Sequence, residues 1–270
     1  MKVAVKVDKL RHDPGLRIAS CAPGDHHQRL ERSSKKQPGY SRVMALILKG
    51  GAVFLHIPKT GGNWVTAVLR EAGLAKGGLG HKHADMSRLI APINHHKSLA
   101  RAHATVHRIK SKLEPKPYMF CFVRHPLKWY QSWFKYMTQP KRNWRNWGQE
   151  KDMFDWHPNA ALNGCGDEDF NQFVRNVNQK RPGYVTEMFA GYAQPQCDFI
   201  GKQESLREDL VRVLQELNLN FDEDFIMNFK ETGVSPEPKQ KVEWDPELRR
   251  ETLRLEHIAL LRYGYDTEES

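Results

Sequence analysis

The sequence predicts an α/β fold in three layers, with a central parallel β-sheet flanked by helices. Two apolar segments, 52–57 and 118–123, have the length and composition of buried strands, and each leads through a short turn into an amphipathic helix. The crossover between the two segments is long enough for parallel pairing. The turns that follow both strands should therefore meet at the carboxyl edge of the sheet, where such folds bind ligands.

The first turn, residues 58–62, has the features of a phosphate-binding loop. It reads Pro-Lys-Thr-Gly-Gly and leads into a helix predicted over 63–73. Lys59 supplies a cation, and the backbone N–H groups of the turn would point at an anion that the helix N-terminus also attracts. We predict that Gly61 and Gly62 are needed because a Cβ there would keep a phosphate away from the backbone.

This turn differs from the loop of nucleotide hydrolases, in which the lysine follows the glycines. Here Lys59 precedes Gly61 and Gly62. No apolar strand further along the chain ends in an obvious Mg²⁺-binding Asp, which argues against a Mg²⁺-dependent triphosphatase. Taken alone, the turn also fits a structural role or another anion site.

The second strand, 118–123, leads into Arg124-His125-Pro126 and then a helix predicted over 127–137. An arginine at the end of a strand can bind a phosphate in bidentate fashion. Ser132, eight residues after Arg124, can add a hydroxyl donor from the helix. A purely structural arginine paired with a carboxylate is the alternative. Two anion sites at the ends of two parallel strands fit one nucleotide that carries two phosphate groups.

The segment from Pro58 to Trp64 resembles the 5′-phosphosulfate loop of the sulfotransferases that use 3′-phosphoadenosine 5′-phosphosulfate (PAPS). The spacing of Arg124 and Ser132 is similar to the one this family uses for the 3′-phosphate. The form His-Ile-Pro-Lys-Thr-Gly-Gly looks closest to the carbohydrate-modifying and bacterial branches. The resemblance covers about 53–266 and implies a P-loop-like three-layer fold, PAPS as co-substrate, no metal requirement, and a hydroxyl acceptor, with carbohydrate favoured.

The resemblance also assigns roles to individual residues. It places the nucleotide against Lys59, Thr60, Gly61, Gly62, Asn63, Trp64, Arg124 and Ser132. Lys59 would neutralise charge on the leaving 5′-phosphate, and Arg124 with Ser132 would bind the 3′-phosphate. Trp64 would border the adenine or be buried in helix packing. The glycine-rich, lysine-containing C-terminal loop of cytosolic relatives is missing, so the residues that complete the 3′-phosphate and adenine site stay open.

The crossover between the two motifs is rich in histidine over residues 80–107. Sulfuryl transfer to a hydroxyl needs a base, and imidazole suits this task near neutral pH. Relatives with the same loop often carry a Lys-His pair at about this distance, which makes His83 the candidate base and His81 the second choice. A solvated or structurally hydrogen-bonded histidine is the alternative for each.

A metal site and a disulfide framework are both disfavoured. His103 and His107 are spaced for one helix face, but no nearby cysteine or well-spaced carboxylate completes a ligand set. The cysteines are scattered without a C-x-x-C pair, which predicts free thiols: Cys21, Cys121, Cys165 and Cys197.

The chain divides into a basic extension, residues 1–43, and one domain, residues 44–270. The extension holds ten Lys/Arg against four Asp/Glu, out of a net charge of +10 for the whole chain. Its Pro and Gly content and weak periodicity predict a flexible segment. It could bind nucleic acid or an anionic glycan, or be dispensable. With no signal peptide or membrane-spanning run, we expect a soluble cytoplasmic protein.

The segment after Arg124 is unusually aromatic. Helical spacing predicts that Trp129, Trp133 and Tyr136 belong to the core. Three further tryptophans lie in a predicted loop and suit a sugar or single-stranded nucleic acid: Trp144, Trp147 and Trp156. A third strand is predicted over 197–201, followed by helices over 205–217 and 246–262.

Two other functions compete with sulfuryl transfer. One is a P-loop-type kinase of unusual motif, and the other is a non-catalytic protein that binds nucleic acid or glycan. The phosphate motifs favour an enzyme, so we expect no nucleic-acid partner. The identity of the acceptor and the oligomeric state are not encoded in any recognisable motif.

Overall fold

The computed structural model describes residues 45–79, 82, 83, 85, 116–139, 157–235 and 241–266. All structural statements below concern these residues. Several predicted features lie outside them: the extension 1–43, His81, His103, His107, Trp144, Trp147 and Trp156.

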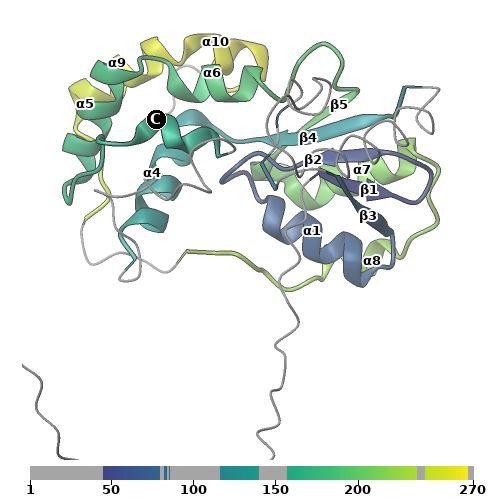
Figure 1. The fold of residues 1–270 in the computed structure, drawn as a ribbon. Helices are drawn as coiled ribbons and strands as arrows, with labels where there is room; N and C mark the ends of the chain where they lie inside the picture. Colours follow the sequence, from purple (N-terminus) through teal and green to yellow (C-terminus); the bar gives the residue numbers. More distant parts are fainter. Residues whose placement is uncertain are drawn as a thin grey trace, which may run out of the picture. The chain divides into compact units, whose positions relative to one another are not determined.

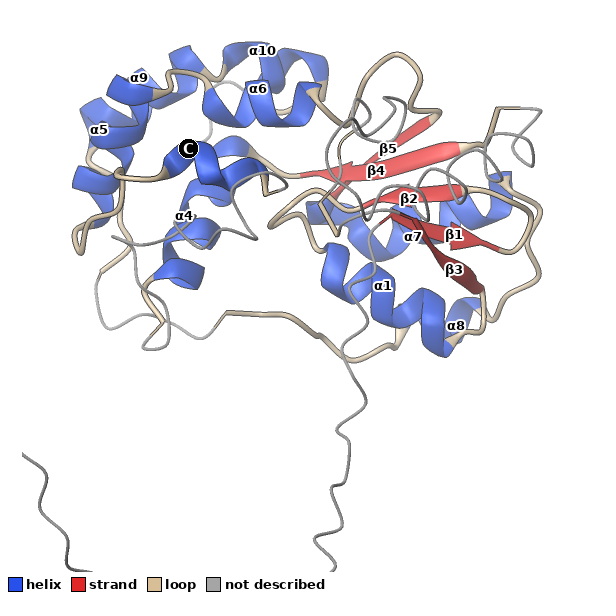
Figure 2. Ribbon diagram, viewed as in Figure 1, coloured by secondary structure: helices blue, strands red, loops and turns tan. Residues whose placement is uncertain are grey.

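A five-stranded sheet forms the centre of the fold, in the order β3-β1-β2-β4-β5 (Figures 1 and 2). The strands are β1 Ala45–Leu48, β2 Val53–Leu55, β3 Ala75–Leu79, β4 Met119–Val123 and β5 Phe199–Lys202. Strands β2, β4 and β5 are parallel, with Leu55 opposite Cys121 and Cys121 opposite Ile200. The predicted α/β class with a parallel sheet centre is confirmed.

The edge formed by β1 and β3 is antiparallel, which the prediction did not include. Gly50 and Gly51 have φ values of 86° and 90°, which only glycine adopts readily, and they form the tight turn between β1 and β2. The predicted strand 52–57 is shortened to Val53–Leu55, because the chain leaves the sheet before Pro58.

Helices cover both faces of the sheet. They are α1 Gly62–Glu71, α4 Pro126–Met137, α5 Phe170–Lys180, α6 Tyr184–Ala190, α7 Leu206–Glu216, α8 Glu223–Met227, α9 Pro246–Leu255 and α10 His257–Arg262. Side chains alternate along a strand, so Phe54, Phe120 and Phe122 pack with α1, α7 and α8. Val53 and Leu55 face the other way, toward the core formed with α4, α5 and α6.

The predicted helix over 246–262 is present but interrupted, because Glu256 divides it into α9 and α10. The Glu256 carboxylate is fully buried. It accepts hydrogen bonds from the Tyr130 hydroxyl at 2.8 Å, the Val185 N–H at 3.0 Å, and the Thr186 N–H and hydroxyl at 2.7 Å each. Burial raises the pKa of this carboxyl. The break turns the Glu256 side chain inward, where it accepts hydrogen bonds from N–H groups in the first turn of α6 that have no partner within the helix.

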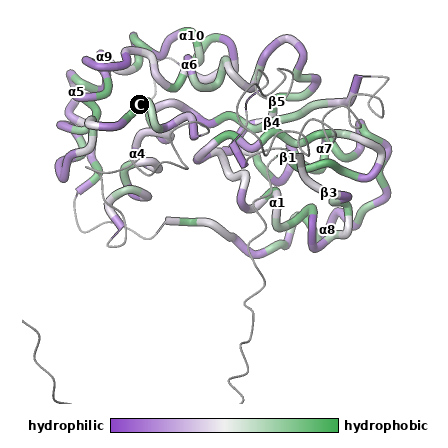
Figure 3. Tube along the Cα trace, viewed as in Figure 1, coloured by the Kyte–Doolittle hydropathy of each residue, from purple (hydrophilic) through white to green (hydrophobic). Residues whose placement is uncertain are grey.

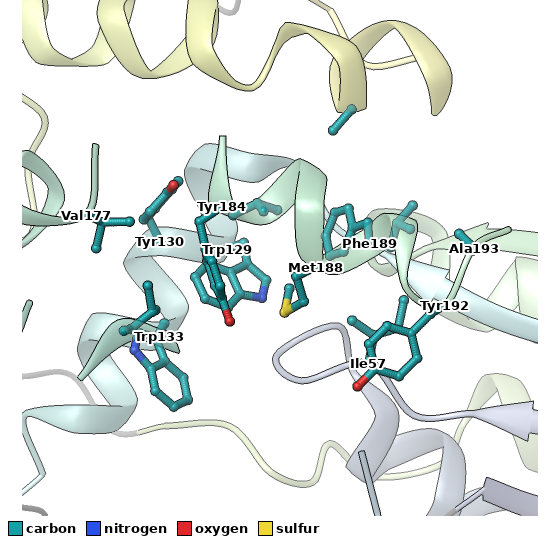
Figure 4. Close-up of a cluster of buried hydrophobic side chains, with 14 of the residues drawn as sticks. Ile57, Trp129, Tyr130, Trp133, Val177, Tyr184, Met188, Phe189, Tyr192 and Ala193 are labelled. Atoms are coloured by element: carbon teal, nitrogen blue, oxygen red, sulfur yellow. The ribbon is translucent and has the colours of Figure 1, made fainter. Parts of the chain in front are cut away.

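The predicted burial of Trp129 and Trp133 is confirmed, while Tyr136 is only partly buried. Figure 4 shows Trp129 within a cluster that includes Tyr130 and Tyr184, with ring centroids 5.6 and 5.7 Å from its own. The central strands are largely hydrophobic along their length (Figure 3). None of the helices in the described ranges is long and apolar enough to cross a membrane.

Candidate active site

A pocket of about 570 Å³ lies at the carboxyl edge of the parallel strands. Residues that follow β2, β4 and β5 line it, as do residues 231–235 after α8. Basic side chains outnumber acidic ones in the lining: Lys59, Arg124, Lys128, Lys135 and Arg207 against Glu204, Glu208 and Glu231. The surplus of cations makes the pocket suited to an anionic ligand.

The loop after β2 positions Lys59 through an uncommon backbone conformation. Lys59 has a φ of 67°, in the left-handed region that costs a non-glycine residue about 1 kcal/mol or more. Neighbouring donors hold this turn: Trp129 Nε1 donates to the Pro58 carbonyl at 2.9 Å, and Arg124 donates to the Lys59 carbonyl at 3.3 Å. The Lys59 ammonium donates to Ser235 Oγ at 3.3 Å.

The backbone at Gly61 and the packing at Gly62 require glycine at these positions without any ligand. A Cβ on Gly61 would lie 2.5 Å from Leu206 Cδ2, and its φ of 83° disfavours any side chain. A Cβ on Gly62 would lie 2.3 Å from His56 Cδ2. The expectation that the glycines serve ligand approach is therefore incomplete, because the apoprotein already needs them.

The loop presents the N-terminus of α1 to the pocket. Gly61 is the N-cap and provides no capping side chain, and Gly61, Gly62, Asn63 and Trp64 all line the pocket. Uncapped N–H groups at a helix start attract an anion. Thr60 is buried and absent from the lining, and its hydroxyl donates to the Ile57 carbonyl at 3.1 Å. That hydroxyl stabilises the loop itself.

The second motif reaches the same pocket. Arg124 and Ser132 both line it, so the structure brings together the two motifs that are distant in sequence. The Arg124 Nε is buried and has no hydrogen-bond partner among the described residues. Burial lowers the pKa of Arg124, while the nearby Glu204 and Tyr265 act to raise it.

Glu204 is the carboxylate that a structural pairing with Arg124 would use. Its Oε1 instead accepts from the His125 N–H at 3.0 Å, and its Oε2 accepts from the Tyr265 hydroxyl at 3.0 Å. Burial and the adjacent Glu204 raise the pKa of that hydroxyl. Glu204 therefore links Tyr265 to the backbone of His125 through hydrogen bonds, and it leaves the Arg124 Nε without a hydrogen-bond partner among the described residues.

A third group of lining residues was missed by the sequence reasoning, which assigned no chemistry to the segment after β5. Arg207 in α7 stacks on Trp64, with its guanidinium carbon 4.9 Å from the ring centroid, and donates to the Ile226 and Met227 carbonyls. The Trp64 Nε1 and the Thr232 hydroxyl are buried without a partner in the described part of the chain. Both residues line the pocket.

His83 is held beside the pocket by His56. Its Nδ1 lies 3.0 Å from the His56 carbonyl oxygen, which only accepts hydrogen bonds, so we assign the ring proton to Nδ1 and a lone pair to Nε2. The His56 ring lines the pocket, whereas His83 does not. The rings of His56 and His157 lie edge to face with that of His83, each with its centroid 4.8 Å away.

His56 and His157 were also missed from the sequence. His56 is the one polar residue in an otherwise apolar strand segment, which is a usable signal in hindsight. His157 has no local signal: it is buried, and its Nδ1 accepts from the Asn159 N–H at 3.1 Å. Only the packing of distant segments brings these rings together.

Burial keeps the histidines neutral. It is the main cause that lowers the pKa of His83 to about 3, with the Lys82 ammonium adding to the effect. Burial lowers the pKa of His56 well below its usual value, and unfavourable electrostatic interactions with His83, Lys82 and His157 lower it further. Lys82 itself donates to Asn63 Oδ1 at 2.5 Å. Both rings should therefore be uncharged at pH 7.

We expect the protein to lose stability as the pH falls from about 6.5 toward 3. An unfolded histidine, with a pKa of about 6.5, takes up a proton in this range, whereas folded His83 does not until about pH 3. His83 alone should cost about 2 kcal/mol of unfolding free energy between pH 7 and pH 5. Urea denaturation at both pH values measures this loss.

The loss should shrink in His83→Gln and persist in His257→Gln, because His257 is exposed on α10 in the folded protein. An unchanged pH dependence in His83→Gln would contradict the depressed pKa of His83.

The comparisons with known proteins agree with this geometry. A family model described as "Sulfotransferase family" matches residues 49–266, which is most of the chain. No curated protein and no solved structure gave a significant match. The match covers the β2 loop, the Arg124 motif, the segment after β5 and Tyr265. This chain belongs to the sulfotransferase family.

Proposed function

We propose that this protein transfers a sulfuryl group from PAPS to a hydroxyl group of an acceptor. The observation that carries the proposal is the meeting of the Lys59 loop with Arg124 and Ser132 at one cation-rich pocket. Family membership supports the reaction class. The two anion-binding motifs at neighbouring strand ends support a nucleotide with two separated anionic groups.

The pocket has unfilled hydrogen-bonding capacity that suits such a nucleotide. Arg124 Nε, Trp64 Nε1 and the Thr232 hydroxyl are buried and lack a partner among the described residues, and all three residues line the pocket. Buried donors without partners are costly, so they favour binding of a group that satisfies them. Trp64 is only 5 % exposed and Arg207 stacks on its ring, so the Arg207 guanidinium, and not the indole, would be the flat group that a base meets.

PAPS supplies a sulfuryl group on a phosphate leaving group. We propose that the Lys59 ammonium stabilises the charge that develops on this phosphate, together with the N–H groups at the start of α1. Arg124 and Ser132 would bind the 3′-phosphate. Fixed cations of this kind would make a metal ion unnecessary, and preorganised charge of this sort is usually the largest catalytic effect.

His83 remains the general base proposed from the sequence, but two observations weigh against it: His83 does not line the pocket, and burial lowers its pKa to about 3. A general base contributes roughly 10²–10⁴-fold. His56 is a second candidate because its ring lines the pocket. Turnover in His83→Gln and His56→Gln separates them: the base variant should lose rate with a changed pH profile, and near-normal turnover would exclude that residue.

We propose a carbohydrate acceptor because the loop His-Ile-Pro-Lys-Thr-Gly-Gly resembles that of carbohydrate-modifying sulfotransferases. A screen of oligosaccharides beside simple phenols and tyrosine peptides tests this choice. Sulfation confined to phenols or tyrosine would overturn it and leave sulfuryl transfer intact.

Calorimetric titration tests the nucleotide class directly. 3′-Phosphoadenosine 5′-phosphate (PAP), the desulfated product, should bind more tightly than AMP, because only PAP engages Arg124 through a 3′-phosphate. ATP with Mg²⁺ should bind more weakly than PAP. Equal or tighter binding of ATP would favour a kinase, and absence of PAP binding would reject the proposal.

A further inference from the structure

The Lys59 ammonium lies over an aromatic ring. Lys59 Nζ is 4.5 Å from the centroid of the Tyr136 ring, and on another side it donates to Ser235 Oγ at 3.3 Å. An aromatic face attracts a cation through its negative quadrupole. Tyr136 does not line the pocket, so its ring supports Lys59 from behind.

Helix α4 also determines the backbone of Lys59. Trp129 in α4 donates to the Pro58 carbonyl at 2.9 Å, and Arg124, just before α4, donates to the Lys59 carbonyl at 3.3 Å. Lys59 keeps a left-handed φ of 67° between these contacts. The backbone and side chain of one residue are thus both held from the same structural unit.

The spacing along α4 connects this support to the proposed 3′-phosphate site. Ser132 and Tyr136 are four residues apart and therefore lie on one face of the helix, about 6 Å apart along its axis. Ser132 lines the pocket, and Tyr136 contacts the lysine. One rigid helix therefore fixes the distance between Ser132 at the proposed 3′-phosphate site and Tyr136 beside Lys59.

We infer that Tyr136 is a positioning residue for Lys59, acting through its aromatic face. The ring holds the ammonium at the pocket, while Ser235 Oγ accepts a hydrogen bond from it. Tyr136 belongs to a series of neighbouring rings, being 5.6 Å from Trp133, which lies 6.0 Å from His157. Packing against this series keeps the Tyr136 ring from turning away from Lys59. The inference rests on the proposed role of Lys59 in sulfuryl transfer.

Nuclear magnetic resonance tests the geometry without any nucleotide. In protein carrying ¹³C-labelled lysine, the Lys59 ε-protons should be shifted upfield by the ring current of Tyr136, and the signal is assigned by its loss in Lys59→Arg. Tyr136→Phe should retain the shift, and Tyr136→Leu should abolish it. A Lys59 signal at the position of an exposed lysine in the unmodified protein would overturn the contact.

Slow hydrolysis of PAPS by water, which yields PAP and sulfate, tests the consequence. Tyr136→Leu should lower this rate by about three- to thirtyfold, the range expected for a lost cation–π contact. Affinity for PAP should fall less than the rate, because Arg124 and Ser132 are untouched and only the contact of Lys59 with the 5′-phosphate is weakened. Tyr136→Phe should restore the rate, since it keeps the ring and removes only the hydroxyl.

Fluorinated phenylalanines at position 136 provide a second series in case Tyr136→Leu folds poorly. They keep the shape of the ring and weaken its quadrupole, so the rate should fall with each added fluorine. An equal rate in Tyr136→Leu and the unmodified protein, or an equal loss in Tyr136→Phe and Tyr136→Leu, would overturn the inference. Failure of the unmodified protein to bind PAP would reject the proposed function and leave the ring-current result interpretable.

Discussion

Lys59→Ala should lose most of the turnover of the proposed sulfuryl transfer, about 10²–10³-fold in kcat, as for the loss of one preorganised charge-stabilising group. The physical reason is that the ammonium is already held at the pocket by Tyr136 and Ser235, so it needs no rearrangement during the reaction. Production of PAP from PAPS in the presence of an acceptor measures the effect.

The control for this variant is its folding and its affinity for PAP. Alanine and lysine pay a similar conformational cost at a φ of 67°, because both carry a Cβ. The melting temperature should therefore change little. Equal losses in kcat and kcat/KM would show that Lys59 acts in the transition state. Lys59→Arg keeps a charge and should retain part of the rate, and a fully active Lys59→Ala would remove Lys59 from the mechanism.

Arg124→Ala should remove most of the preference for PAP over AMP, with PAP affinity falling about 100-fold and Ser132 retaining the rest. A hydrogen bond to a charged group contributes roughly 1.5–3 kcal/mol, and each 1.4 kcal/mol is about tenfold. The buried Arg124 Nε has no partner among the described residues, so a bound phosphate would satisfy it. AMP lacks the 3′-phosphate and should bind this variant as it binds the unmodified protein.

The ratio of the two affinities is the discriminating quantity, because Arg124 also donates to the Lys59 carbonyl and its loss will disturb turnover as well. Arg175→Ala is the matched control, since Arg175 lies exposed on α5 with an ion pair to Asp245. A variant that loses affinity for PAP and AMP alike would place Arg124 in the support of the loop, with the 3′-phosphate bound elsewhere.

The two predictions address different ends of one site. Lys59 should act on the reacting bond, and Arg124 should act on ground-state recognition of the nucleotide. A kinase that uses ATP does not need to recognise a 3′-phosphate, so it should show no preference for PAP over AMP. The pair of variants therefore separates the proposed reaction from the main enzymatic alternative.

The two candidate phosphate-binding motifs could be recognised in the sequence because each is local. A strand, a turn and a helix start occupy about ten residues, and the required residue types are readable at fixed spacing, as from Pro58 to Trp64. The same locality made the α/β class and the buried strands β2 and β4 predictable. Family membership followed from these short segments.

Packing between distant segments decided the remainder. The break at Glu256 exists because its buried carboxylate accepts hydrogen bonds from Thr186 at the start of α6, 70 residues away. The helical periodicity of the segment does not indicate such a distant partner. Likewise, the sequence predicts glycine at Gly62 for ligand approach, and only the structure shows the His56 ring that excludes a side chain.

The sequence by itself determined the family, because the segments around Lys59 and Arg124 that carry the resemblance are local motifs. The tertiary structure decided what surrounds them: the Tyr136 ring under Lys59, the Arg207 guanidinium on Trp64, and the histidine rings around His83. Those neighbours depend on how helices dock against the sheet. Docking is a property of side-chain volume and burial summed over the whole chain, which no short spacing pattern encodes.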